Sequence, residues 1–579
     1  MTRLPSARSA ARATAVVLMA TATTATGPGG VATAAEAAPG TVSYARAAAD
    51  ITGVGKPLDL LMHPVSGKLY VGGDILPAAP ETDERGLYAL DPATGAVLSH
   101  VPQAPGPNGL PRAAAVARFA GPLPGAADGV VFNYPLRGLG SAKDGDAAAQ
   151  GVWLAGATVT GVGQGFSAGT TLVGQGAVLS ETETATGTVK RSVTPGGIGL
   201  FAVDTARKAV WFGDFDAGRL HRVDEDTFTV MASYDIPAGL GSTRFVVVDP
   251  ADGSVWVGRG NTVSVFAAGG ALRTTLKGVD LAGDVAFDTV THRAYVVWMD
   301  GDSDSVEGSD ANGVGSLGVY DTETLAAAAE SVPIPQSSSQ YGNAAVAVTP
   351  GGGAVFVTNP NLDVAKVMKF VRKVSPKVTG QPADVTAAAG GAVELAAHAA
   401  GTPAPAVRWQ SSADSGATWQ NVEGDAAAKD TYAFTAEATL NGRRYRAEFS
   451  NDTGVALTDP VTLTVTAKGP EDPGTEDPGT EDPGTEDPGT EDPGTQDPGT
   501  QDPGTEDPGT EQPGGDGGSG SAGASGGTVG DTGITPNGSP SGSLASTGAS
   551  MLPAAGAAAA LLAAGVVAVR RSRRREVGE

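Results

Sequence analysis

The fold is decided by the stretch Asp249-Pro250-Ala251-Asp252-Gly253-Ser254-Val255-Trp256-Val257-Gly258. Pro fixes φ and Gly permits positive φ, so its first half reads as a polar turn. Its second half is an apolar, aromatic, apolar triplet that is typical of a buried strand. The same design recurs in Pro64 to Gly72, Asp204 to Gly213, Asp288 to Val297 and Pro350 to Asn359. The chain therefore repeats one short unit of strand, turn and strand.

A second recurring element follows several of these units: an alternating strand that ends in Asp, with Thr three residues later. It is present at Leu87 to Asp91 with Thr94, at Leu220 to Asp224 with Thr227, and at Leu317 to Asp321 with Thr324. The aromatic anchors Trp211 and Trp256 are 45 residues apart, and Tyr295 follows after another 39. Short strands at this period predict a β-propeller.

The propeller is predicted to span residues 41–375. Tyr70 to Trp211 covers 141 residues, room for about three blades, with strands predicted at Val130 to Phe132 and Val152 to Leu154. Six or seven blades fit the spacing, and seven is favoured. The segment Thr41 to Tyr44 is expected to pair with the last blade, which would close the ring and remove open sheet edges.

The repeats resemble the YVTN family of surface-layer and lactonase-like propellers. Val355-Phe356-Val357-Thr358-Asn359 comes closest to the family pattern, whereas residues 101–195 match poorly. The resemblance implies an extracellular all-β ring.

Residues 376–467 are predicted to form one immunoglobulin-like β-sandwich. Trp409 has the position of the core tryptophan, and Tyr445 begins a strand with a tyrosine corner. Ala447 stands where many such domains have cysteine, and Leu395 is expected opposite it. The spacing Trp409-Gln410, Ser412, Asp414, Gly416, Trp419 resembles disulfide-free modules of actinobacterial surface proteins. Such modules serve as spacers or adhesive units.

Residues 468–543 are predicted to be a disordered stalk. Six EDPGT and two QDPGT pentads fill 471–510, and a Gly/Ser-rich stretch follows. The pentads contain no apolar residue that could build a core. The favoured interpretation is a spacer, and the alternative is an acidic segment that binds calcium or a basic partner.

The end of the chain, residues 544–579, carries a predicted cell-wall sorting signal. Leu544-Ala545-Ser546-Thr547-Gly548 precedes an uncharged run, 551–569, which is long enough for one transmembrane helix. Five arginines then follow, and these would remain cytoplasmic.

The pentapeptide resembles the LPxTG family of sortase motifs in its LAxTG variant. The resemblance implies that a sortase cuts after Thr547 and joins it to peptidoglycan. An ordinary tail anchor after a chance pentapeptide is the alternative.

Residues 1–35 are predicted to be a secretory signal peptide read by the Sec machinery. Arg3, Arg8 and Arg12 precede a modest apolar stretch, and small residues suggest cleavage near Ala34 or Ala35. A transit peptide is the alternative, which the wall signal disfavours. The protein is thus expected at the cell surface, with a single-pass membrane intermediate before sorting.

Composition agrees with an extracellular setting. The chain of 579 residues has no cysteine, which excludes disulfides and thiolate metal sites. The formal net charge is −25, and removal of the two terminal signals, which together carry a net charge of +6, would leave −31. Such a surface repels nucleic acid and anionic lipid, so neither is an expected partner.

The sequence offers few candidate catalytic or metal-binding residues. Gly165 to Gly169 fits the G-x-S-x-G pattern around Ser167, but both flanks are Gly-rich, so the match is interpreted as chance. No two of the five histidines, His63, His100, His221, His292 and His398, lie within four residues of each other. No catalytic residue is assigned.

Asp300, Asp302 and Asp304 alternate like the opening of a calcium loop, but Ala311 stands where an EF-hand has Glu. A solvated acidic insertion is favoured over a calcium site, and no other cofactor is expected.

We therefore expect a wall-anchored display protein whose propeller and immunoglobulin-like domain bind an unknown extracellular protein or glycan. The first alternative is an extracellular propeller enzyme, lactonase-like or lyase-like, with its site at the channel mouth. The second is a structural wall component without a soluble ligand.

Overall fold

The computed structural model describes a large part of the chain. The described residues are 38–74, 84–102, 118–123, 127–134, 138–143, 145–146, 149–154, 159–215, 217–238, 243–301, 312–335, 344–359 and 365–468. Strands dominate this part, and its few helical turns are single 3-10 turns. The predicted all-β class is confirmed.

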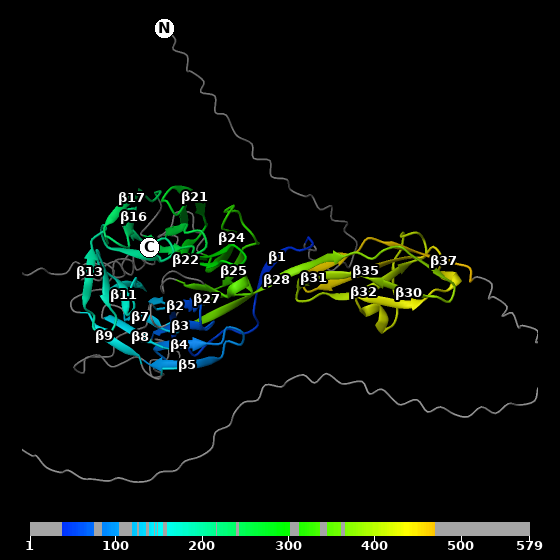
Figure 1. The fold of residues 1–579 in the computed structure, drawn as a ribbon, viewed down its shortest axis with the longest axis horizontal. Coiled ribbons are helices and arrows are strands. Elements are labelled where there is room, and N and C mark those ends of the chain that lie inside the picture. The colour runs from blue at the N-terminus through cyan, green and yellow to red at the C-terminus, as the bar shows by residue number, and fades with distance from the viewer. Residues whose placement is uncertain are drawn as a thin grey trace, which may run out of the picture. The chain divides into compact units, whose positions relative to one another are not determined.

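In the described residues the propeller has seven antiparallel blades (Figure 1), which we number 1 to 7 along the chain: six are four-stranded sheets, and the seventh is the four-stranded part of a five-stranded sheet. Blades 1 to 4 are β2 (Lys56–Met62), β3 (Leu69–Asp74), β4 (Gly86–Leu90) and β5 (Val97–Pro102); β6 (Arg118–Ala120), β7 (Val130–Tyr134), β8 (Gly138–Ala142) and β9 (Gln150–Trp153); β10 (Val159–Gln164), β11 (Thr170–Gln175), β12 (Val178–Glu183) and β13 (Val189–Val193); and β14 (Gly199–Asp204), β15 (Ala209–Asp214), β16 (Arg219–Asp224) and β17 (Val230–Asp235). Blades 5 to 7 are β18 (Thr243–Val248), β19 (Val255–Arg259), β20 (Thr262–Phe266) and β21 (Leu272–Lys277); β22 (Leu281–Asp288), β23 (Arg293–Met299), β24 (Val314–Asp321) and β25 (Val332–Pro335); and β26 (Val346–Val348), β27 (Ala354–Asn359), β28 (Lys366–Gly380) and β1 (Val42–Arg46).

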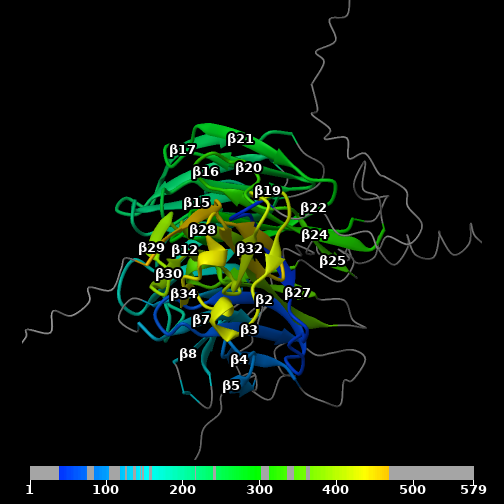
Figure 2. The same ribbon diagram turned by 90° about the vertical axis from the view of Figure 1, so that its right-hand side faces the viewer.

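The ring is closed. The first strand of each blade contacts the first strand of the next, and β26 of blade 7 contacts β2 of blade 1. In Figure 2, β2 to β5 run in order from the middle of the ring to its rim, as do β19 to β21. The structure therefore resolves the choice between six and seven blades in favour of seven.

Closure depends on strand β1, as the sequence predicts. Val42 faces Val374 and Arg46 faces Phe370 in an antiparallel register with β28. The Tyr44 hydroxyl lies 2.7 Å from the Tyr295 hydroxyl, and both side chains are buried. The N-terminal strand thus completes the blade that ends the propeller.

The repeated turn is built from an acceptor and a residue with positive φ. The Asp249 carboxylate accepts the Ala251 N–H at 2.9 Å, and Gly253 has a φ of 75°. In blade 1 the His63 ring takes the place of the aspartate and accepts the Ser66 N–H at 3.1 Å. The turn therefore explains why polar residues precede each aromatic triplet.

The aromatic residues of the triplets fill the spaces between blades. Trp211, Trp256, Tyr295 and Phe356 are almost fully buried in the second strand of their blades. Apolar burial is the main favourable term in folding, so these residues explain the periodic pattern.

The segment that matches the repeat poorly also forms blades. The strands predicted around Phe132 and Trp153 are present as β7 and β9. Strand β6 has only three residues and β9 only four. Short strands carry few apolar positions, so the period is weak in the sequence.

Residues after the propeller form the second part of the same compact unit. Its strands are β29 (Val385–Ala388), β30 (Ala392–Ala396), β31 (His398–Thr402), β32 (Ala406–Ser412), β33 (Gln420–Asn421), β34 (Thr431–Thr435), β35 (Arg444–Asn451), β36 (Gly454–Leu457) and β37 (Val461–Thr466). They make a sheet with order β29, β37, β35, β32, β33 and a pair, β30 with β34. Strand β31 pairs with β28, which runs without interruption out of blade 7.

This part has its own core around Trp409. Leu395 and Ala447 are buried in that core, in agreement with an apolar pair in place of a disulfide. The Ser412 to Gly416 turn is held by hydrogen bonds, and the Arg446 guanidinium lies 4.2 Å from the Trp419 ring centre. The tryptophan signature therefore stabilises the domain.

Three predicted segments lie outside the described residues: the signal peptide, the stalk from residue 469 onward, and the sorting signal with its helix at 551–569. Where the structure is described, it contains no helix that is long and apolar enough to cross a membrane.

Candidate functional site

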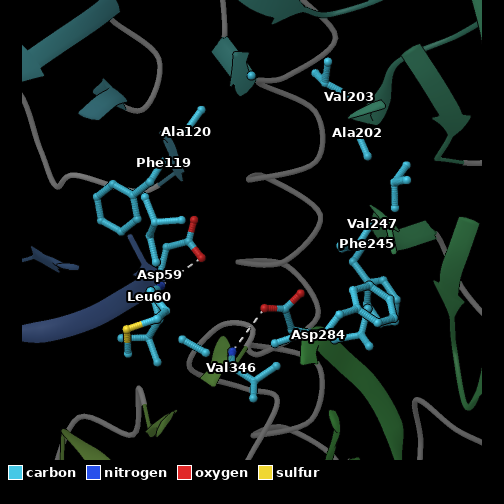
Figure 3. A pocket seen from close by; sticks show the side chains of 18 of the residues that line it. Asp59, Leu60, Phe119, Ala120, Ala202, Val203, Phe245, Val247, Asp284 and Val346 are labelled. Atoms are coloured by element: carbon cyan, nitrogen blue, oxygen red, sulfur yellow. Dashed lines mark hydrogen bonds between the residues drawn. The ribbon is translucent and has the colours of Figure 1, made fainter. Parts of the chain in front are cut away.

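A cavity of about 650 Å³ lies at the centre of the propeller (Figure 3). All seven blades contribute to it through their first strands, β2, β6, β10, β14, β18, β22 and β26. Such a convergence of strands from the whole chain makes the channel the first candidate for a ligand site.

Four of these inner strands contain a β-bulge. The register shifts between Pro57 and Asp59, between Thr243 and Phe245, and between Ala282 and Asp284. The fourth shift, in β10, precedes Gly161. A bulge redirects the side chains next to it. In β2, β18 and β22 a charged residue, Asp59, Arg244 or Asp284, lies at or next to the bulge.

Three aspartates line the cavity: Asp59, Asp284 and Asp288. Of these, Asp59 and Asp284 lie at equivalent places in blades 1 and 6. Figure 3 shows both side chains extending into it from β2 and β22. The Asp284 Oδ2 atom accepts the Val346 N–H of β26 at 3.1 Å, and the Asp59 Oδ1 atom accepts the Leu60 N–H at 3.0 Å. Backbone donors thus fix the orientation of each carboxylate.

Arg244 adds a positive charge to the same cavity from the bulge of β18. Burial lowers the pKa of its guanidinium, because loss of solvent disfavours the charged form. The rings of Phe119 and Phe245 supply apolar surface nearby. Acceptors, a donor and aromatic faces together suit a ligand that has hydroxyl groups as well as apolar surface.

The cavity lining contains no His, Cys or Glu among the described residues. Nor does any group of three or more His, Cys, Asp or Glu side chains in the described part of the chain come together as a metal would require. Of the histidines, His63 supports a turn and His100 stacks on Tyr88 at 4.1 Å. The positions His221, His292 and His398 lie in β16, in a blade turn and in β31.

The weak calcium candidate is only partly described. Asp300 is buried, and its Oδ2 atom accepts the Gly313 N–H at 3.1 Å. Asp302 and Asp304 lie outside the described residues, so a calcium loop stays a prediction.

Ser167 has the surroundings of a turn. Its carbonyl accepts the Thr170 hydroxyl proton at 2.7 Å, and strand β11 follows at once. A nucleophile elbow requires a helix at that place. The G-x-S-x-G match is therefore a chance match.

The sorting motif, Leu544, Ala545, Ser546, Thr547 and Gly548, lies outside the described residues and stays a prediction. Sequence reasoning missed the channel residues Asp59, Arg244 and Asp284. A signal was present, because each is a charged residue that begins an apolar run four or five residues before the turn acceptor. Only the closed ring of blades, however, shows that these runs face one another across the channel.

No family model matches the chain. It is 43% identical over 96 residues to endoglucanase C of Cellulomonas fimi, which is 17% of this chain and 8% of that protein. Similar structures include a chain of Kuenenia stuttgartiensis hydrazine synthase, with a TM-score of 0.40 and 14% identity over 55% of this chain and 96% of that one. Another is the Swd1 β-propeller domain of Myceliophteria thermophila, with a TM-score of 0.41 and 9% identity over 55% of this chain and 99% of that one. At these scores the similarity carries no argument about function.

Proposed function

We propose that this chain is a secreted, cell-wall-anchored surface protein whose propeller binds an extracellular ligand in its channel. The observation that carries the binding role is the central cavity, in which Asp59, Arg244 and Asp284 converge from three blades. The proposed cell-wall location rests on the terminal signals in the sequence, and a separate experiment below tests it.

Binding is favoured over turnover by the chemistry of the cavity. The enzyme alternative, a lactonase-like or lyase-like propeller, would use histidine and acidic residues at the channel mouth. The described lining offers aspartates without histidine. Fixed carboxylates and a guanidinium are sufficient to orient a polar ligand by hydrogen bonds.

A glycan is the ligand class to test first, and a protein loop is the second. Sugar hydroxyls donate to carboxylates and accept from a guanidinium, while the faces of sugar rings pack on Phe119 or Phe245. The similarity to a protein named endoglucanase, although it covers only 96 residues, also points toward glycans.

The binding proposal predicts that Asp59→Asn and Asp284→Asn together weaken ligand affinity at least tenfold. Each loses a charged acceptor, and a hydrogen bond to a charged group contributes about 1.5 to 3 kcal/mol. A glycan array identifies the ligand for the secreted chain, and calorimetric titration then compares the variants. Asp226→Asn, on a side chain 73% exposed outside the cavity, is the matched control.

Equal affinity of the double variant and the control would overturn a channel site. Release of a product from a bound glycan or lactone, abolished by the double variant, would support the enzyme instead.

The proposed cell-wall location predicts that deletion of Leu544 to Gly548 moves the protein from the wall fraction to the membrane or the medium. A sortase must recognise the pentapeptide to attach the chain to the wall, whereas the apolar run can insert into the membrane without it. Cell fractionation with a lysozyme-released wall fraction measures the change. Wall attachment that survives the deletion would defeat the sortase interpretation.

A further inference from the structure

Blade 4 carries a hydrogen-bonded chain of three side chains outside the channel lining. The Ser233 hydroxyl of β17 lies 2.8 Å from His221 Nδ1 of β16. On the opposite side of the imidazole, His221 Nε2 lies 3.4 Å from Asp214 Oδ2 at the end of β15. With its proton on Nε2, the imidazole donates to the carboxylate and accepts from the serine.

Strand register places these three residues on one face of the sheet. His221 faces Ser233 across β16 and β17, and it faces Phe212 across β15 and β16. Asp214 comes two residues after Phe212, so its side chain points to the same side. The arrangement is thus set by the backbone and needs no unusual rotamer.

Other blades have the same register and different residues. The equivalent cross-strand pair is Ser180 with Ser192 in blade 3 and Ser264 with Thr275 in blade 5. Gln175 takes the place of Asp214 in blade 3. Strand pairing alone therefore does not require a histidine or an acid here.

The three hydrogen-bonded side chains differ in their solvent exposure. Asp214 and His221 are only 4% and 7% exposed, whereas Ser233 is exposed on the edge strand. The Asp214 Oδ1 atom is buried without a hydrogen-bond partner among the described residues. A buried carboxylate is costly to leave unpaired, and the His221 ring is the polar group beside its other oxygen.

The surrounding backbone approaches closely. A Cβ atom at Gly196 would lie 2.5 Å from Asp214 Oδ1 and 2.7 Å from His221 Nε2, so glycine lets the backbone pass over the pair without displacing either side chain. The Ile236 N–H donates to the Gly218 carbonyl across the same strand pair. Because N–H groups alternate in direction, the Ser233 N–H points away from β16, toward the open side of the edge strand.

We propose that Ser233 is a nucleophile for acyl transfer, with His221 as its general base and Asp214 as the group that orients the imidazole. The substrate class is a carboxylic ester. Because Ser233 lies on an open surface, we expect an ester that is small and sterically accessible. This site is separate from the channel and from Ser167.

The reaction runs in two balanced steps. Ser233 Oγ bonds to the ester carbonyl carbon, its proton passes to His221 Nδ1, and the outward Ser233 N–H faces the oxyanion. Collapse expels the alcohol, which takes that proton, and leaves an acyl-serine. Water then bonds to the acyl carbon and gives a proton to the same nitrogen. The bond from that carbon to Ser233 Oγ breaks, Oγ takes the proton back, and the acid leaves.

The test uses the secreted chain with a fluorophosphonate probe, followed by peptide mass spectrometry and p-nitrophenyl acetate hydrolysis. Labelling at Ser233 is expected, with loss in Ser233→Ala and at least a tenfold lower rate in His221→Gln and Asp214→Asn. Ser192→Ala, the matched edge serine of blade 3, should label as the parent does.

The pH profile separates catalysis from a structural role. A catalytic His221 gives a labelling rate that rises with pH as the imidazole loses its proton, and this dependence should vanish in His221→Gln. Absence of labelling at Ser233, or a His221→Gln variant that melts normally and labels as fast as the parent, would overturn the proposal.

Discussion

The turn between the first two strands of a blade needs one residue with positive φ, and different residues fill that place. Glycine does so at Gly67 and Gly253, where φ is 66° and 75°. Lys208 and His292 occupy the corresponding places with φ of 50° and 53°. A left-handed conformation costs a residue with a Cβ atom roughly 1 kcal/mol. The turns thus differ in strain while their shape is kept.

This difference predicts opposite effects for two substitutions. Gly67→Ala should lower the free energy of unfolding by about 1 kcal/mol, because a Cβ there meets no atom within 4 Å and the cost is conformational. Lys208→Gly should be neutral or stabilise by a few tenths of a kcal/mol. Urea unfolding followed by tryptophan fluorescence measures both. A stabilising Gly67→Ala would contradict the assignment of strain.

At the level of elements, the sequence predicted what depends on local patterns. The turn followed by Val255-Trp256-Val257 and the early segment around Tyr44 were sufficient for blades and for closure. The bulges next to Asp59 and Asp284 were not predicted, because the residues that follow are almost all apolar and show no break in alternation that would mark an extra residue. The function of these bulges depends on strands far away in sequence.

Closure by β1 leads to a prediction at this scale. Tyr44→Phe should lower the free energy of unfolding by about 1 kcal/mol, because the buried Tyr295 hydroxyl loses its partner. Tyr234→Phe, whose hydroxyl donates to the Gly269 carbonyl in an exposed position, is the control and should cost less. Thermal unfolding by circular dichroism compares the two. A larger effect of the control would show that the Tyr44 contact does not stabilise closure.

For the whole molecule, the charged groups predict how stability depends on pH. Hydrogen bonds and ion pairs hold the pKa of Asp50, Glu181, Asp224 and Asp321 below the ordinary range. Burial raises the pKa of Asp249, which opposes this effect. The lowered carboxylates bind protons more readily when unfolded, so their contribution is complete above about pH 4 and is lost as pH falls below it.

The expected result is a melting temperature of the propeller that is lower at pH 3 than at pH 7. Differential scanning calorimetry at constant ionic strength provides the measurement. An equal or higher melting temperature at pH 3 would mean that burial of groups such as Asp249 dominates.

The sequence by itself determined the all-β class, the period of the blades, the closing strand and the positions of Trp409 and Tyr445 in the second domain. These features follow from turn chemistry and from the alternation of apolar residues, which act over a few neighbouring positions. The tertiary structure alone decided that there are seven blades, that Asp59, Arg244 and Asp284 share one cavity, and that Ser233, His221 and Asp214 touch. The placement of the blades around one channel and the register between strands bring such residues together, and neither is written in local sequence.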